Sequence, residues 1–273
     1  MRLLVRSWNV FHGNAVPPER RGHLEQMVRL AVADGPDLVC LQEVPAWALE
    51  RLDDWSGMIA FGEVAQRPTI GPLPSTPELG RRLSTLHQGR LRSAFSGQAN
   101  AILVAPGLRG IEERRCVLNP PRFRRRQARW LRLPLRARLA WASERRVCQA
   151  LRLETHEGST LVLANLHATS YAPDERLADA ELLRAASFAD GLAGPGEPVL
   201  LCGDFNVVAG RSATLEELAR WGFSAPGPGI DQVLVRGAAA GPCEPWPEER
   251  RRVDGRLLSD HAPVDAPIDL QGN

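Results

Sequence analysis

The chain of 273 residues contains no lysine, so all 34 of its basic residues are arginine. This absence excludes a Walker-type phosphate loop and any mechanism that forms a Schiff base through lysine. The sequence also lacks a Gly-x-Ser-x-Gly elbow, a His-Glu-x-x-His pair and a Gly-x-Gly-x-x-Gly fingerprint after a strand. The chemistries that depend on those motifs are therefore disfavoured.

Long apolar runs and paired cysteines are missing as well. No apolar run approaches the length that crosses a bilayer, and the opening stretch MRLLVRSWN is interrupted by Arg6, unlike a signal peptide. The five cysteines are scattered, odd in number and without a Cys-x-x-Cys pair, which favours free thiols in a reducing compartment. We expect a cytoplasmic protein with no membrane span, and we take it to be a monomer.

The remaining composition is that of an ordinary globular protein, with 44% apolar and 24% charged residues and a net charge of +2. The charge is too small for the whole molecule to act as a strong polyanion binder. The length allows one large domain or two modest ones. Two proline-rich stretches, 66–97 and 237–252, read as loops, and neither demands a boundary, so we expect one domain over residues 1–273.

Short apolar runs alternate with fewer amphipathic segments along the chain. Helices are expected over 18–34, after Pro45, over 173–191 and over 214–221, the last opening with a capping box from Thr214 to Glu217. The excess of strands, many in adjacent pairs, indicates an α/β fold with mixed sheets. Strands are expected near 2–8, 37–42, 57–62, 99–105, 113–118, 147–154, 160–166, 198–203, 230–236 and 262–268.

Two stretches echo each other across the chain, DLVCLQE at 37–43 and PVLLCGD at 198–204. Each is an apolar strand that follows a helix and ends in an acid. The repetition predicts two similar layers packed face to face.

Polar side chains follow five of the expected strands. In PVLLCGDFNVV a buried strand ends at Asp204 with Asn206 two residues on, and an ionised carboxylate there is costly unless it has a partner. Strand ends are where α/β folds collect ligand groups, because neighbouring termini converge on one crevice. The other polar residues at strand ends are Asn9, Glu43, Asn165, His167, Asp260 and His261.

Together these side chains indicate a metal-assisted hydrolysis. The acids Glu43, Asp204, Asp231 and Asp260, with Asn9 and Asn206, offer the hard oxygen atoms that suit Mg²⁺ or Mn²⁺ rather than zinc. A divalent cation would also relieve the repulsion within the cluster. His167 and His261 are placed to exchange protons near a phosphoryl oxygen. Without a nucleophilic serine or cysteine, this set points to attack by an activated water.

Six short motifs occur in a fixed order over about 255 residues, and they resemble the endonuclease/exonuclease/phosphatase superfamily, the DNase I-like fold. The resemblance implies a four-layer αββα sandwich of two mixed β-sheets flanked by helices, with the site at the mouth where strand ends of both sheets meet. A seventh stretch, GQANAILV at 97–104, is similar to the family's mid-chain strand. The six motifs are SWNV (7–10), LQE (41–43), NLH (165–167), GDFN (203–206), IDQVLV (230–235) and SDH (259–261).

The same resemblance implies a role for each site residue. Glu43 would be the principal metal ligand, helped directly or through water by Asn9 and Asp260. His261, oriented by Asp231, would contact the scissile phosphate. The remaining three would act on the water and the phosphate: Asp204 positions or deprotonates the water, Asn206 holds the water or the phosphate, and His167 donates to a phosphate oxygen.

The substrate stays open between a nuclease acting on DNA or RNA, a phosphatase or phosphodiesterase acting on a small phosphate ester, and a non-catalytic binding protein. The exonuclease III-like branch usually carries an acid or amide where this chain has Phe11, which disfavours abasic-site repair. His12 either packs in a turn or joins the site. Residues 116–143 carry eight arginines, Trp130, Trp141 and no acid, and either bind a phosphate backbone and bases or form a hairpin with a solvated face.

Overall fold

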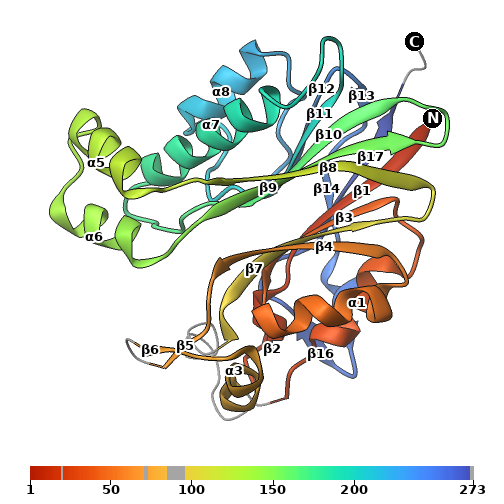
Figure 1. Cartoon of the computed structure of the whole chain (residues 1–273), viewed down its shortest axis with the longest axis horizontal. Coiled ribbons are helices and arrows are strands. Elements are labelled where there is room, and N and C mark those ends of the chain that lie inside the picture. The colour runs from red at the N-terminus through yellow and green to blue at the C-terminus, as the bar shows by residue number, and fades with distance from the viewer. Residues whose placement is uncertain (20, 71–72, 85–95, 271–273) are drawn as a thin grey trace.

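The structure, a computed structural model, describes residues 1–19, 21–70, 73–84 and 96–270. It contains two large β-sheets packed face to face (Figure 1). The first has the strand order β13-β17-β1-β3-β7-β4, with β14 also paired to β17. Its strands are β1 (Arg2–Asn9), β3 (Leu38–Val44), β4 (Ile59–Gln66), β7 (Gln98–Val104), β13 (Ala239–Ala240), β14 (Glu244–Pro245) and β17 (Val264–Asp269).

The second sheet has the order β12-β11-β10-β9-β8. Each sheet is mixed, with one parallel pair, β1 with β3 in the first and β10 with β11 in the second. The parallel pairs matter for the site because the carboxyl ends of parallel strands lie at the same edge. The strands of this sheet are β8 (Leu108–Val117), β9 (Val147–Thr155), β10 (Thr160–His167), β11 (Val199–Asp204) and β12 (Asp231–Arg236).

The main core lies between the two sheets. Aliphatic side chains from alternate positions of both sheets are almost fully buried there, including Leu3 and Val5 of β1, Leu161 and Leu163 of β10 and Leu200 of β11. Because side chains alternate across a strand, the other face of each sheet needs its own cover. Helices supply that cover and complete four layers (Figure 1).

The helices segregate between the two outer faces. On the first sheet lie α1 (Leu24–Val32), the 3₁₀ segment η2 (Ala46–Arg51) and α2 (Leu52–Ser56). On the second lie α7 (Arg176–Asp190) and α8 (Ala213–Arg220). After α1 the chain turns at Gly35, which has φ +70°, a conformation that glycine adopts without strain.

Two helices, α5 (Pro121–Trp130) and α6 (Leu135–Ser143), follow β8 and form a hairpin at one end of the molecule, away from both termini (Figure 1). The buried side chains of Ala128, Leu133, Ala137 and Trp141 pack this hairpin together with Leu177 of α7. The shorter elements are η1 (Phe11–Gly13), β2 (Ala15–Val16), β5 (Thr69–Ile70), β6 (Leu73–Pro74), α3 (Pro77–Ser84), η3 (Glu248–Arg251), β15 (Arg252–Val253) and β16 (Arg256–Leu258).

The predicted fold class is confirmed, and so are the ten expected strands and the two face-to-face layers. Residues 116–143 include a hairpin formed by the two helices α5 and α6. Three local expectations were wrong. Residues 66–97 contain β5, β6 and α3, although 71–72 and 85–95 lie outside the described residues. Residues 237–252, the other expected loop, contain β13, β14 and η3. Helix α8 is capped by Ser212, whose Oγ accepts from Leu215 N, so the expected Thr214 cap lies two residues too late.

Among the described residues the five cysteines are free thiols, and no helix is long and apolar enough to cross a membrane.

Candidate active site

The ends of both parallel strand pairs meet at one cavity of about 620 Å³. Strand β3 delivers Glu43 from the first sheet, and β10 and β11 deliver His167 and Asp204 from the second. His167 and Asp204 are register partners across the parallel pair, so they stand side by side. Asn206, Asp260 and His261 line the same cavity, while Asn9 and Asp231 reach it through hydrogen bonds.

Gly203 allows the second pair of strands to come this close. It has φ +141°, and a Cβ atom added there would lie 1.8 Å from the Leu166 carbonyl oxygen. No side chain fits in that space. Glycine before Asp204 is therefore a condition for placing the carboxylate beside His167.

Glu43 lies at the centre of a group of polar side chains from four different segments. Its Oε1 is 3.3 Å from the Asn9 amide nitrogen and 3.8 Å from His167 Nε2, and its Oε2 is 3.2 Å from His12 Nε2. The Asn9 amide oxygen accepts from Phe11 N, so its nitrogen is the atom that faces the carboxylates. In this arrangement Asn9 orients Glu43 rather than presenting a ligand oxygen of its own.

Asp204 is the most buried acid of the site, with 1% of its surface exposed. Its Oδ2 accepts from Asn9 Nδ2 at 3.1 Å, and its Oδ1 accepts from Asn206 N at 3.1 Å. Burial away from water, and next the negative charge of Asp231, raise the pKa of Asp204 to about 7. The two hydrogen bonds therefore compensate only part of the cost of burying the Asp204 charge, which was noted from the sequence.

His261 and Asp231 form a hydrogen-bonded pair, with His261 Nδ1 2.8 Å from Asp231 Oδ2. Burial lowers the pKa of His261, but the hydrogen bond and charge of Asp231 outweigh it and raise the pKa to about 10. The backbone of His261 is held in turn by Ser259 and Trp8. A protonated imidazole therefore points its Nε2 toward Asp204, 3.9 Å away.

His167 is the neutral counterpart of His261. Burial, and next the positive charge of Arg146, hold the pKa of His167 well below its ordinary value. Its Nδ1 lies 2.8 Å from Gln98 Nε2 and 3.0 Å from Arg146 Nη1, both of which are donors. Nε2 faces Asp204 at 3.5 Å and Glu43 at 3.8 Å, and Arg146 Nη1 also lies 3.2 Å from it. Because Gln98 donates to Nδ1 and two carboxylates face Nε2, the surroundings favour the tautomer with its proton on Nε2.

The last two expected residues occupy different depths. Asn206 has φ +50°, donates through Nδ2 to the Ala168 carbonyl and lines the cavity wall. Asp260 is exposed at the mouth of the cavity. Left-handed backbone also occurs at Glu43, Ser259 and His12. Non-glycine residues seldom adopt it, and its concentration around one cavity is typical of a functional site.

Arg146 and Gln98 line the cavity although neither was expected there, and His12, open between two roles in the sequence, lines it as well. Arg146 is 5% exposed, lines the cavity, and is paired with Glu144, yet its Nε is buried without a hydrogen-bond partner. It immediately precedes β9 in a chain rich in arginine, so no local pattern marks it. Gln98 begins β7 and could have been identified from the sequence, because it lies in GQANAILV (97–104), the stretch that is similar to the family's mid-chain strand. Asn165 was grouped with the strand-end residues but lies between the sheets instead.

The donor set fits a hard divalent cation. Carboxylate oxygens from Glu43, Asp204 and Asp231 converge, and Asp231 Oδ1 is buried without a hydrogen-bond partner. One ligand atom from each of Asp204, Asp231 and His261 lies within 4.8 Å of the others. Glu43, whose carboxylate lies beside His12 in the same cavity, offers a second place for the ion.

The fold and this site define a DNase I-like α/β sandwich whose polar site lies at the ends of the parallel strands of both sheets. The chain belongs to the Endonuclease/Exonuclease/phosphatase family, whose model matches residues 7–261. A search of the curated proteins found no sequence that matches.

Solved structures share the fold at low sequence identity. A conserved protein of unknown function from Enterococcus faecalis V583 has a TM-score of 0.68 at 15% identity, covering 98% of this chain and 99% of that one. An endonuclease/exonuclease/phosphatase from Bacteroides vulgatus has a TM-score of 0.67 at 14% identity, covering 99% and 100%. The human Nocturnin catalytic domain with bound sulfate anion has 0.61 at 17%, covering 98% and 94%.

Proposed function

We propose that this protein is a Mg²⁺- or Mn²⁺-dependent hydrolase that cleaves phosphodiester bonds in nucleic acid. The observation that carries the proposal is the meeting of Glu43, His167, Asp204 and His261 at one cavity, although more than 200 residues separate the first from the last. Family membership supports phosphoesterase activity in general.

In the proposed reaction Asp204 takes a proton from the attacking water. A general base is most effective when its pKa lies near the working pH, and Asp204 has a pKa of about 7. Asn9 and the Asn206 amide hold the carboxylate in place from two sides. The side chain of Asn206 is positioned at the cavity wall to hold the water or a phosphate oxygen.

The two histidines act on the phosphate in different charge states. His261, protonated and oriented by Asp231, stabilises the negative charge that develops on a phosphate oxygen. His167, neutral and with its proton on Nε2, donates a hydrogen bond to another oxygen. Arg146 keeps His167 in that state and brings a second fixed positive charge to the cavity.

The residues proposed to hold the metal are Glu43, directly, and Asp260, directly or through water, with Asn9 orienting Glu43. A bound divalent ion would act as a Lewis acid on a phosphoryl oxygen. Hydrolysis of a small phosphate ester is the competing function, because the same side chains serve a monoester as well as a diester.

An activity panel tests the proposal. The chain is assayed with Mg²⁺ and with Mn²⁺ against plasmid DNA, single-stranded RNA, bis-p-nitrophenyl phosphate and several phosphomonoesters, with His261→Ala as the blank. We expect metal-dependent cleavage of nucleic acid that the blank lacks. Turnover of the monoesters alone would assign the competing function, and no turnover of any substrate would contradict a catalytic role.

A further inference from the structure

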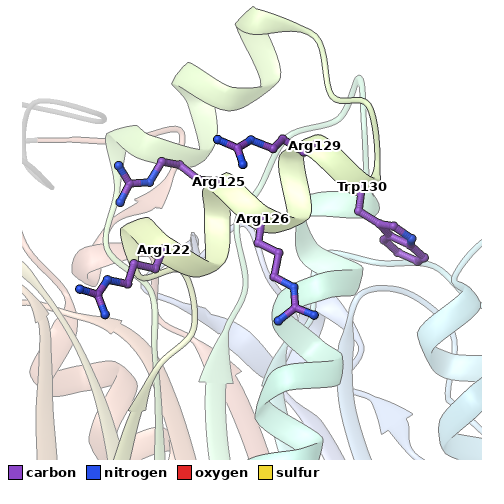
Figure 2. A pocket seen from close by; sticks show the side chains of 5 residues that line it. All are labelled: Arg122, Arg125, Arg126, Arg129 and Trp130. Carbon is purple, nitrogen blue, oxygen red and sulfur yellow. The ribbon is translucent and has the colours of Figure 1, made fainter.

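The outer surface of α5 carries a row of arginines. Arg122, Arg125, Arg126 and Arg129 lie on two successive turns, where Arg122 and Arg129 are each three and four residues from Arg125 and Arg126. With Trp130 they line a surface hollow of about 510 Å³. Their side chains extend from the helix rather than packing onto it (Figure 2). On a helix this spacing places charges on successive turns, so the row spans roughly 10 Å.

These four guanidinium groups are not neutralised by the protein. Within the described part of the chain, no carboxylate lies within ion-pair distance of any of them, and residues 116–143 contain no acid. Exposed arginines elsewhere commonly have a partner, as Arg29 has Glu25 and Arg109 has Glu154. The charge of +2 for the whole chain is thus unevenly distributed, with an uncompensated positive surface on this helix.

This arrangement is unfavourable for α5 on its own. The helix has no acid in its first turn, and basic side chains near a helix N-terminus oppose the helix dipole. Like charges three and four residues apart also repel each other. A bound polyanion would remove both effects, so the row makes physical sense as a binding surface.

Trp130 indicates which polyanion fits. Its side chain is 78% exposed, the most exposed of the large apolar side chains in the described residues. An exposed indole beside unpaired guanidinium groups offers a stacking surface to an unpaired base while the arginines bind its phosphates. Leu135 and Leu139 of α6 are also exposed, as a lipid-binding surface would require, but they do not line the hollow.

The row is connected to the active site through α6. Arg125 and Arg129 also line a groove of about 380 Å³ between α5 and α6, together with Arg138 and Trp141. The residues that follow Trp141, Ser143 and Glu144, line the catalytic cavity. Helix α6 thus contributes residues both to the groove beside the arginine row and to the catalytic cavity.

We propose that the α5 surface formed by Arg122, Arg125, Arg126, Arg129 and Trp130 binds single-stranded nucleic acid and directs it into the catalytic cavity. This inference rests on the proposed function and adds to it the substrate class. The arginines bind successive phosphates, and Trp130 stacks on a base.

Binding is measured separately from cleavage, by fluorescence anisotropy of labelled dT20 and U20 in EDTA over a range of salt concentrations. The test variant replaces Arg122, Arg125, Arg126 and Arg129 by Gln. The control replaces Arg2, Arg21, Arg51 and Arg67 by Gln, four exposed arginines that also have no ion pair among the described residues and that lose the same total charge. Trp130→Ala is measured alongside with single-stranded and duplex DNA.

We expect the test variant to bind at least tenfold more weakly at 50 mM salt, and its slope of log affinity against log salt to fall by about 3 for four lost phosphate contacts. The control should change little. Trp130→Ala should weaken single-strand binding more than duplex binding. All variants should hydrolyse bis-p-nitrophenyl phosphate at the wild-type rate.

Two outcomes would overturn the inference. In the first, the test and control variants lose affinity equally. In the second, the arginine row is needed for sedimentation with phosphatidylcholine–phosphatidylserine vesicles but not for binding dT20 or U20, which would assign the surface to a membrane. Row-dependent binding without hydrolysis of any substrate would instead contradict the proposed function and leave the binding surface standing.

Discussion

At the scale of single residues, Asp204 shows a conflict between stability and chemistry. Its carboxylate is almost fully buried, and neighbouring acids add to the cost of its charge. A side chain selected only for stability would be neutral at this position. The unfavourable carboxylate is therefore a mark of function.

Replacing Asp204 by Asn tests this conflict directly. The amide keeps the shape but cannot accept a proton from water, so we expect turnover to fall by at least roughly 100-fold. The melting temperature should stay equal or rise, because a buried charge is removed. Steady-state kinetics and thermal unfolding measure the two effects, and a variant that retains most of its activity would contradict the role of Asp204.

Glu43→Ala should change the metal requirement rather than the fold. Glu43 is only partly buried and its carboxylate faces the polar side chains of Asn9 and His12, so we expect its loss to leave the core intact. We expect weaker activation by Mg²⁺, with the half-saturating concentration raised by roughly tenfold or more. A titration of activity against Mg²⁺ that superposes on the wild-type curve would count against Glu43 as a ligand.

At the scale of elements, Arg6 of β1 connects its own strand to β17 and to the segment that follows α1. Its side chain is fully buried and pairs with Asp34 beyond α1 at 2.7 Å and with Asp265 of β17 at 2.6 Å. Trp246 stacks on the guanidinium at 4.2 Å. This arginine holds α1 and β17 against β1, the strand that ends at Asn9.

The pair of Arg6 and Asp34 predicts a pH effect on stability. The hydrogen bond from Arg6 lowers the pKa of Asp34 from 3.8 to about 2. Because the folded pKa lies below the unfolded value, the stabilisation is complete above pH 3.8 and is lost as the pH falls toward 2. After allowance for solvent screening it is about 1 kcal/mol.

Urea unfolding of the wild type and Asp34→Asn at several pH values measures this contribution. The gap in free energy of unfolding between the two proteins should be constant near neutral pH and should narrow between pH 4 and 2. A gap that does not depend on pH would show that Asp34 contributes no charge interaction.

At the scale of the whole molecule, the two sheets are joined by a buried polar contact close to the site. Gln42 of β3 donates to Asn165 Oδ1 of β10 at 2.8 Å, and Asn165 Nδ2 donates to the carbonyls of Leu41 and Ala101 at 2.9 Å. Aliphatic packing permits some sliding, whereas these hydrogen bonds are directional. We therefore expect them to set the position of Glu43 relative to His167.

Asn165→Ala, compared with Leu163→Ala on the same strand, separates positioning from stability. Each variant should lose about 2–4 kcal/mol, the first through unsatisfied polar groups and the second through a cavity. We expect kcat to be lower in Asn165→Ala than in Leu163→Ala. Calorimetry measures the stability of each variant, and it should show a single unfolding transition if residues 1–273 form one domain as predicted. Equal losses of kcat at equal losses of stability would contradict the positioning role.

Much of the architecture could be predicted because it depends on local patterns. Short apolar runs located the ten principal strands, and the polar residues that end such runs marked Glu43, His167 and Asp204. His261 was marked by its place just before the last strand. Helices α5 and α6 were not predicted because arginines surround the buried positions Ala128 in α5 and Ala137 in α6. Arg146 was not predicted because the residues around it in the sequence resemble those around an exposed arginine.

The sequence by itself determined which side chains end which strands, since alternation and strand length are properties of adjacent residues. Only the tertiary structure decided their charge states and partners. The pKa values of Asp204 and His261 depend on burial and on acids brought together from distant segments. Likewise the sequence contains the arginine row, but only the folded chain shows that no carboxylate reaches it, because ion pairs form across space rather than along the chain.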